Sequence, residues 1–553
     1  MSDGKCHLNE YIVESAARYL QTVVLVDDHA YQNGSTNVPS DVNVPGQVDR
    51  KRAVSSDDAT PGLQEGTGKT AEDPEKREEA SFQKVQHGFA KRSIICSLYQ
   101  PEENASFGDG SEVHQICSAA DVVVVDWSFY GDAGERANEL IGNLVQQSRN
   151  EAPHQMKLLL IYTLADDVEK VAREVCANLK SRIGEESVKY EEKGTGLTIT
   201  TNNARIVVLS KREDRFSQYS ALFVPEGELV ERTIAEFSCL ASGLLQSIVL
   251  RGLAFLRKND LRILTRFHSD LDAAFLTHRA LLLPDESFRQ IIPLLTDELR
   301  AVLEDTLGDC PLGDASEVSR IIEDWCATRW EPGDLNKDTC AGAVPSEFAN
   351  DFFKSGHEYS KWSDNWKRDT KKAEMAKLLS TDSKGVPRPE LLSVVMSQRV
   401  CYENASRALH LGVILRELEG DRRYMLCLQP VCDSVRINGK TARFIFCFLD
   451  AASPDKPLTH TLVDLNDNPI DLTYNPRTGN CCVVGFTVES STLCAAKNGD
   501  GCFVYEADDK TKYEWIAELK TEHAQRAAEE FGRVLSRVGL TESEWLRLSA
   551  KKK

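Results

Sequence analysis

Four short runs of Val, Ile and Leu constrain the fold of this chain more than any other feature. They read TVVLVDD (22–28), DVVVVDW (121–127), KLLLIYT (157–163) and ARIVVLSK (204–211). Runs without polar alternation predict strands that are buried on both faces, as in a parallel sheet. A further strand is expected at about 94–98, a hairpin at 187–203, and helices at about 82–91, 111–119, 133–149, 166–182 and 228–258. The N-terminal part therefore predicts an α/β fold.

Each of the four apolar runs ends on a polar side chain. Asp27 and Asp28 close the first run, Asp126 the second, Thr163 the third and Lys211 the fourth. In an open parallel sheet, ligands bind just beyond the carboxyl ends of the strands. We therefore expect these five residues to meet at one edge of the sheet, although they lie far apart in the sequence.

This set of residues suits phosphoryl chemistry on a carboxylate. Mg2+ prefers oxygen ligands and needs only a few carboxylates, one of which can attack a phosphoryl group. An ammonium and a hydroxyl can then stabilise the phosphoryl oxygens. Taken singly, an Asp after a strand is more often a helix N-cap, and a Thr or Lys there is usually the first solvated residue. The complete ordered set favours chemistry.

The order of these residues resembles that of receiver (response-regulator) domains of two-component signalling. The similarity covers about residues 8–255 and is greatest to the response receiver proteins of bacterial conflict and phage-defence loci. It implies a flavodoxin-like sheet, Mg2+ as cofactor, and a role for each residue. By this resemblance the phosphoacceptor is Asp126, the metal ligands are Asp27, Asp28 and Asp126, the switch hydroxyl is Thr163, and the lysine that contacts the phosphate is Lys211.

Two positions near the lysine depart from the receiver pattern. Receivers usually carry an aromatic residue three positions before the lysine, and many carry a proline directly after it. Here these positions are Val208 and Arg212. We therefore expect an intact phosphorylation pocket without the usual aromatic relay, so that the signal leaves through another face or the domain acts by docking alone.

A polar segment rich in Pro, Gly, Ser and Asp interrupts the first domain at about residues 31–79. It has too few large apolar residues to offset the entropy of ordering, so it predicts a disordered insertion beside the pocket. The run Gly66–Thr70 within it imitates a phosphate-binding P-loop. Because position 63 is Leu and no strand precedes the run, we interpret it as a chance match.

The remaining residues predict two further regions after a receiver-like domain at 1–255. Apolar residues at steps of three and four make 256–400 a helical region. Short strands separated by turn residues make 401–553 an α+β domain with a small β-barrel or curled sheet, closed by helices at about 517–538 and 543–552. A basic, aromatic stretch at 345–380 would suit stacking on a partner or single-stranded nucleic acid, but such aromatic residues more often fill a helical core, and helical spacing alone explains the pattern.

Composition narrows the functional class of the chain. The 553 residues carry a net charge of −20, so no nucleic-acid partner is expected for the chain as a whole, and no membrane span or cleavable signal is evident. Sixteen cysteines without a C-x2-C spacing suggest reduced core thiols in a cytoplasmic protein. Cys432 beside Asp433 is a weak candidate nucleophile, since no base is indicated within reach.

Two functional hypotheses follow. The first is a signalling relay, in which a histidine kinase or a GHKL-type ATPase phosphorylates Asp126 and the modification changes contacts of the later domains, with self-association as one outcome. The second is an adaptor or effector that works without phosphorylation and whose C-terminal half carries the activity. Slow loss of the phosphate by hydrolysis would not make the protein an enzyme.

Overall fold

The computed structural model divides the chain into two compact units, residues 1–360 and 361–553. Residues 31–73 of the insertion expected at 31–79, and the basic, aromatic stretch at 345–380, lie outside the described residues. The structure describes residues 7–30, 74–193, 196–213, 218–281, 291–305, 320–321, 389–402, 405–434, 437, 440–452, 460–463, 469–536 and 542–550.

A seven-stranded sheet forms the centre of the first unit, in the order β2-β1-β3-β4-β7-β6-β5. The strands β1 to β4 and β7 are all parallel, which confirms the sheet predicted from the apolar runs. The hairpin expected at 187–203 is β5 and β6, which adds two antiparallel strands beside β7. The strands are β1 (Thr22–Val26), β2 (Ile95–Tyr99), β3 (Val122–Val125), β4 (Lys157–Thr163), β5 (Lys189–Lys193), β6 (Gly196–Thr200) and β7 (Ala204–Ser210).

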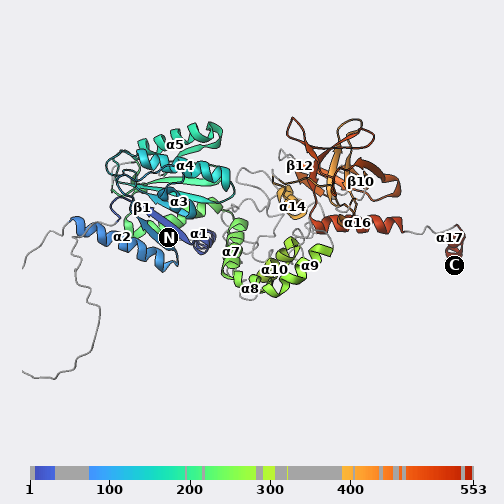
Figure 1. The fold of residues 1–553 in the computed structure, drawn as a ribbon, viewed down its shortest axis with the longest axis horizontal. Coiled ribbons are helices and arrows are strands. Elements are labelled where there is room, and N and C mark those ends of the chain that lie inside the picture. The colour runs from blue at the N-terminus through green and yellow to red at the C-terminus, as the bar shows by residue number, and fades with distance from the viewer. Residues whose placement is uncertain are drawn as a thin grey trace, which may run out of the picture. The chain divides into compact units, whose positions relative to one another are not determined.

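Helices cover both faces of this sheet (Figure 1). Side chains of α3 (Glu112–Ala119), α4 (Glu135–Glu151) and α5 (Val168–Ile183) pack on one face. Those of α1 (His7–Tyr19), α2 (Pro74–Lys91) and α6 (Leu229–Ser238) pack on the other. Because both faces are buried, a strand can be apolar throughout, as β3 is, or along its interior, as β4 is. The first unit is therefore a three-layer, flavodoxin-like α/β fold.

Two helix boundaries differ from the prediction. The helix expected from Phe82 begins at Pro74, because a proline fits the first helical turn and strong helix formers follow it. The last six residues of the expected insertion at 31–79 are therefore helical. The single helix expected at 228–258 is broken into α6 and α7 (Leu244–Lys258), with a bend of 113° at Ser242 and Gly243.

The second unit is built on a nine-stranded antiparallel sheet in the order β11-β12-β10-β9-β8-β16-β15-β14, with β13 paired to β10. This curled sheet confirms the β-rich architecture predicted for the C-terminal part. Its strands are β8 (Val413–Glu417), β9 (Tyr424–Cys427), β10 (Thr441–Ala451), β11 (His460–Val463), β12 (Pro469–Tyr474), β13 (Cys481–Thr487), β14 (Ala496–Lys497), β15 (Phe503–Glu506) and β16 (Lys512–Glu518).

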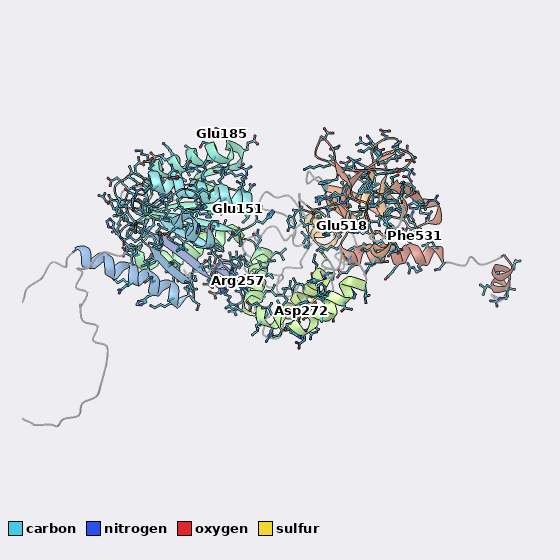
Figure 2. The ribbon with its side chains drawn as sticks, viewed as in Figure 1. Glu151, Glu185, Arg257, Asp272, Glu518 and Phe531 are labelled. Atoms are coloured by element: carbon cyan, nitrogen blue, oxygen red, sulfur yellow. The ribbon has the colours of Figure 1, made fainter. Side chains whose placement is uncertain are left out.

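The helix α16 (Thr521–Leu535) closes one face of this sheet, with Phe531 buried in the core between them (Figure 2). A helix was expected from about residue 517, but β16 continues to Glu518. The reason is tertiary, because Ala517 and Glu518 pair with β8 and are buried there. A short helix, α15 (Val431–Ser434), follows β9, and α17 (Glu542–Ser549) lies near the C-terminus.

The described residues that follow the first sheet in the sequence and precede the second are mostly helical, as predicted. They form α8 (Asp260–Leu264), α9 (Asp272–Leu281), α10 (Ile291–Asp305) and α14 (Pro389–Ser397). Among the helices that the structure describes, none is by itself both long and apolar enough to cross a membrane. The segments Glu226–Ala241 and Leu244–Lys258 meet that criterion only as a bent pair.

Candidate functional site

A cavity of about 690 Å³ opens at the carboxyl ends of the parallel strands. All five polar residues singled out from the sequence line it, on β1, β3, β4 and β7 or directly after them. Phe82 and Val85 of α2, and Glu226 just before α6, extend its wall on the α2 side of the sheet. The expected convergence of distant residues at one sheet edge is therefore present.

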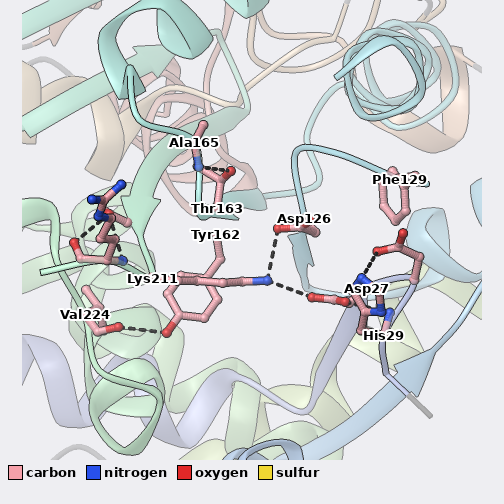
Figure 3. A network of polar contacts seen from close by, with 12 residues as sticks. Asp27, His29, Asp126, Phe129, Tyr162, Thr163, Ala165, Lys211 and Val224 are labelled. Atoms are coloured by element: carbon pink, nitrogen blue, oxygen red, sulfur yellow. Dashed lines mark hydrogen bonds and ion pairs between the residues drawn. The ribbon is translucent and has the colours of Figure 1, made fainter. Parts of the chain in front are cut away.

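Lys211 connects two of the carboxylates directly (Figure 3). Its ammonium Nζ lies 2.8 Å from Asp27 Oδ2 and 3.0 Å from Asp126 Oδ1. The side chain reaches this position across the ring of Tyr162, with Nζ 5.4 Å from the ring centroid. Asp27 and Asp126 follow neighbouring strands, so a single cation can bridge them.

Asp28 is oriented differently from Asp27. Its Oδ2 accepts a hydrogen bond of 2.6 Å from the backbone amide of Tyr130. Its Oδ1 is buried and has no hydrogen-bond partner among the residues that the structure describes, with His29 Nε2 3.9 Å away. Asp27 Oδ1 accepts from the His29 amide at 2.9 Å. One carboxylate oxygen of the cluster is therefore left without a donor.

The charges at this edge act on one another. Burial raises the pKa of Asp126, Lys211 opposes that rise, and Asp27 and Asp28 add to it. Burial by itself would lower the pKa of Lys211, but Asp126 and Asp27 raise it above the usual range. Three carboxylates stand against one ammonium in this cluster, a balance of groups that a divalent cation would suit.

The residues present fit a Mg2+ ion in donor chemistry. Three carboxylates supply hard oxygen ligands, and the unpartnered Asp28 Oδ1 is the kind of atom that such an ion satisfies. As these side chains are arranged in the structure, no group of three or more His, Cys, Asp or Glu among the described residues is placed to hold a metal ion. In this structure, the Lys211 ammonium forms ion pairs with both Asp27 and Asp126.

Thr163 ends β4 at the cavity, and its Oγ1 accepts a hydrogen bond of 3.0 Å from the Ala165 amide. Its hydroxyl proton remains to be donated to a ligand. The preceding residue, Tyr162, points to the opposite face of the sheet from Val208. Its hydroxyl donates a buried hydrogen bond of 2.8 Å to the Val224 carbonyl, which lies just before α6 (Figure 3).

Residues 19–216 match the family model whose description is response receiver domain. This part of the chain is a response receiver domain. The resemblance inferred from the order of the strand-end residues is thereby confirmed for the N-terminal region. None of the curated proteins compared with the chain matches it. A receiver domain places the protein in phosphoacceptor signalling in general terms, in which a phosphodonor such as a kinase is the partner.

Sequence reasoning missed several residues that shape the site of this receiver domain. The Tyr130 amide and Tyr162 contact the predicted residues directly, and Asp132 holds the loop that carries Tyr130. Tyr162 had a signal, because it stands beside Thr163 at a strand end. Asp132 had one too, since it lies between Gly131 and Gly134 in a sequence typical of a turn.

Among the described residues outside the receiver domain, no contact supports a catalytic role for Cys432, the weak candidate nucleophile. Cys432 is exposed, and its Sγ donates a hydrogen bond to the neighbouring Asp433 Oδ1, at 3.4 Å. His410 instead lies 3.7 Å from Glu518, and His460 packs against His523. Neither contact brings a base to Cys432.

Proposed function

We propose that the protein is a phosphoacceptor in which Asp126 receives a phosphoryl group, and that the modification is relayed to the later parts of the chain. The observation that carries this proposal is the position of Lys211 Nζ, 2.8 Å from Asp27 and 3.0 Å from Asp126, inside a cavity that Thr163 also lines. Acceptor, counter-charge and hydroxyl donor thus surround one space.

The chemistry assigns a role to each side chain. An ionised Asp126 oxygen attacks phosphorus, the bond to the donor's leaving group breaks, and the leaving group departs with the electron pair. Lys211 then exchanges a carboxylate contact for a phosphoryl oxygen, and Thr163 donates its hydroxyl proton to another. Asp27, Asp28 and Asp126 would hold Mg2+, which when bound supplies further positive charge to the phosphoryl oxygens.

The partner that this proposal requires is a phosphodonor protein, a histidine kinase or a GHKL-type ATPase. Self-association of the phosphorylated chain is one way for the signal to act. The described cysteines are free, and several are buried, which supports a reducing, cytoplasmic setting. A role in phage defence would follow if the donor belongs to such a system.

The test is an intact-mass measurement of the full chain with Mg2+ and acetyl phosphate. We expect one added phosphate in the wild type and none in Asp126→Asn. Asp166→Asn is the matched control, because Asp166 is an exposed carboxylate near the cavity that pairs with Arg212, and it should leave the adduct intact. An adduct that persists in Asp126→Asn, or no adduct with acetyl phosphate, carbamoyl phosphate and phosphoramidate, would refute the proposal.

The alternative is an adaptor or effector that works without phosphorylation. It is supported by the second unit, which has hydrophobic cores of its own built from the curled sheet and α16. Under this alternative, Asp126→Asn leaves cellular function unchanged, whereas deletion of residues 409–553 abolishes it. Under the relay, both changes abolish it.

A further inference from the structure

The loop between β3 and α4 has an unusual backbone beside Asp28. Four of its residues have positive φ, namely Tyr130 (53°), Gly131 (79°), Ala133 (55°) and Gly134 (97°). This conformation suits glycine, but it is unfavourable for Tyr130 and Ala133. A loop of this shape persists only where other interactions hold it, and residues held in this way often serve a site.

The side chain of Asp132 supplies those interactions. Its Oδ1 accepts from the amide of Phe129 at 2.9 Å and from that of Gly134 at 3.0 Å. Its Oδ2 accepts from the amide of Arg136 at 3.0 Å, in the first turn of α4. The side chain is only 13% exposed, so water competes little for these donors. One carboxylate therefore fixes the loop on both sides of Asp132 itself.

Two packing contacts complete the loop. The Tyr130 hydroxyl donates to the Pro101 carbonyl at 2.7 Å. Gly134 lies directly under Trp127, since a Cβ there would stand 2.0 Å from Trp127 Cε2. The loop is therefore anchored at its start, middle and end.

This arrangement aims the Tyr130 amide at Asp28. The amide donates to Asp28 Oδ2 at 2.6 Å, which is short for a nitrogen donor and typical of a bond to a charged acceptor. With Oδ2 so engaged, the carboxylate plane is fixed and the unpartnered Oδ1 is the oxygen left for a ligand. Hydrogen bonds of this kind orient metal-binding carboxylates in other sites.

We propose that Asp132 is a positioning residue for the cation site, which acts by holding the Tyr130 amide against Asp28 so that one carboxylate oxygen is presented to Mg2+. This inference deepens the proposed function and depends on it. It assigns the affinity for Mg2+ partly to a residue that does not itself reach the ion.

The test is a calorimetric titration of the full chain with Mg2+ alone, without a phosphodonor. We expect Asp132→Ala to weaken binding by about 10- to 100-fold, as the loss of such orienting partners does elsewhere. Asp132→Asn keeps an oxygen for Phe129 and Gly134, so it should recover most of the affinity. Tyr130→Phe retains the amide but loses the hydroxyl contact with the Pro101 carbonyl, so it should weaken binding less than Asp132→Ala does.

Asp167→Ala is the control for a purely structural effect. Asp167 caps α5 by accepting from the Lys170 amide at 2.9 Å, so its loss also removes the partner of a backbone donor, here at an exposed helix N-terminus, without touching Asp28. We expect lower thermal stability in this variant and unchanged Mg2+ affinity.

Three outcomes would overturn the inference. Wild-type affinity in a folded Asp132→Ala chain would do so, and so would an equal loss of affinity in Asp167→Ala. If Asp132→Ala does not fold, the Asp132→Asn chain is compared instead. A Mg2+ affinity of that chain no higher than that of an Asp28→Asn chain would count against the role. If one of these outcomes is found while the wild type accepts phosphate on Asp126, the proposed function stands and only the role of Asp132 is refuted. A wild type that binds no Mg2+ contradicts both the role of Asp132 and the proposed function.

Discussion

The two sheets of this protein use polar residues in different ways. In the receiver sheet, the interiors of β1, β3 and β4 are apolar, and polar side chains gather at the carboxyl ends of β1, β3, β4 and β7. In the C-terminal sheet, charged side chains lie along the strands and pair with side chains of the neighbouring strand. Arg416 and Glu514, for example, are directly opposite on β8 and β16, with a hydrogen bond of 3.1 Å from Nε.

Strand direction explains the difference. Parallel strands bring all their carboxyl ends to one edge, so residues far apart in sequence meet there. Antiparallel neighbours point in opposite directions, and their side chains meet as cross-strand pairs. Such pairs stabilise a fold without gathering polar residues at one edge, which is why the sequence indicated a convergent site for the first sheet and only a weak candidate, Cys432, for the C-terminal part.

The largest effect is expected from Arg407, a buried charged side chain that packs against residues of the C-terminal sheet. Arg407 is 3% exposed, and its guanidinium lies 4.7 Å from the ring centroids of both Phe503 and Trp515. It donates to the carbonyls of Cys401, Tyr402 and Ala405. Arg407→Ala should cost about 4 kcal/mol, since it leaves a void and three acceptors without this donor.

Chemical denaturation measures this loss, and hydrogen exchange of residues 503–518 assigns it to the C-terminal sheet. Arg443→Ala on β10 is the control, because that side chain is exposed and its removal should change the stability little. Equal effects of the two substitutions would remove the distinction between the sheets.

The next largest effect is expected from Lys157, a charged residue that is buried in the receiver sheet. Lys157 begins β4 and is buried, and its Nζ donates to the carbonyls of Cys117, Ser118 and Ala120 at 2.5 to 3.1 Å, at the end of α3. Burial lowers the pKa of Lys157 to about 8, and the side chains of Cys117 and Asp121 oppose that shift. Lys157→Met should cost about 3 kcal/mol, because charged donors to buried carbonyls are strong.

The comparison also predicts that this lysine serves stability alone, because it lies at the opposite ends of the strands from the cavity. Phosphorylation by acetyl phosphate should therefore persist in Lys157→Met at temperatures where the domain is folded. The exposed Lys189→Met on β5 serves as the control. A folded Lys157→Met chain that accepts no phosphate would contradict the division of roles.

A pH effect is expected in the C-terminal sheet. Burial lowers the pKa of His460 to about 4, and His523 and Arg526 add to the shift. Below about pH 6.5 the unfolded chain takes up a proton that the folded chain does not, so stability falls towards pH 4, by about 2 kcal/mol. Urea titrations across this range should show a smaller fall for His460→Gln, and an identical fall would exclude His460 as the cause.

The smallest effect concerns the hydroxyl of Tyr162. Tyr162→Phe removes its hydrogen bond to the Val224 carbonyl and should cost about 1 kcal/mol. Tyr190→Phe is the control, since the Tyr190 hydroxyl is buried without a hydrogen-bond partner among the described residues, and its loss should be neutral. Thermal unfolding distinguishes the two variants, and equal stability would mean that the Val224 contact contributes nothing.

Much of the receiver domain was predictable because its signals are local. Buried parallel strands are apolar along their whole length, and each polar terminal residue marks where a strand ends. The break at Gly243 and the extension of β16 to Glu518 were not predictable in this way. Helical periodicity continues across the first, and the second depends on pairing with β8, some hundred residues earlier in the chain.

The amino-acid sequence alone determined the parallel sheet, the order of its strand ends and the five residues that meet there, because strand length and direction follow from short-range patterns. Only the tertiary structure decided which atoms touch. That Lys211 bridges Asp27 and Asp126, and that the Tyr130 amide orients Asp28, depends on loop backbone angles and side-chain rotamers. Those are set by packing between segments up to 184 residues apart, which no local pattern records.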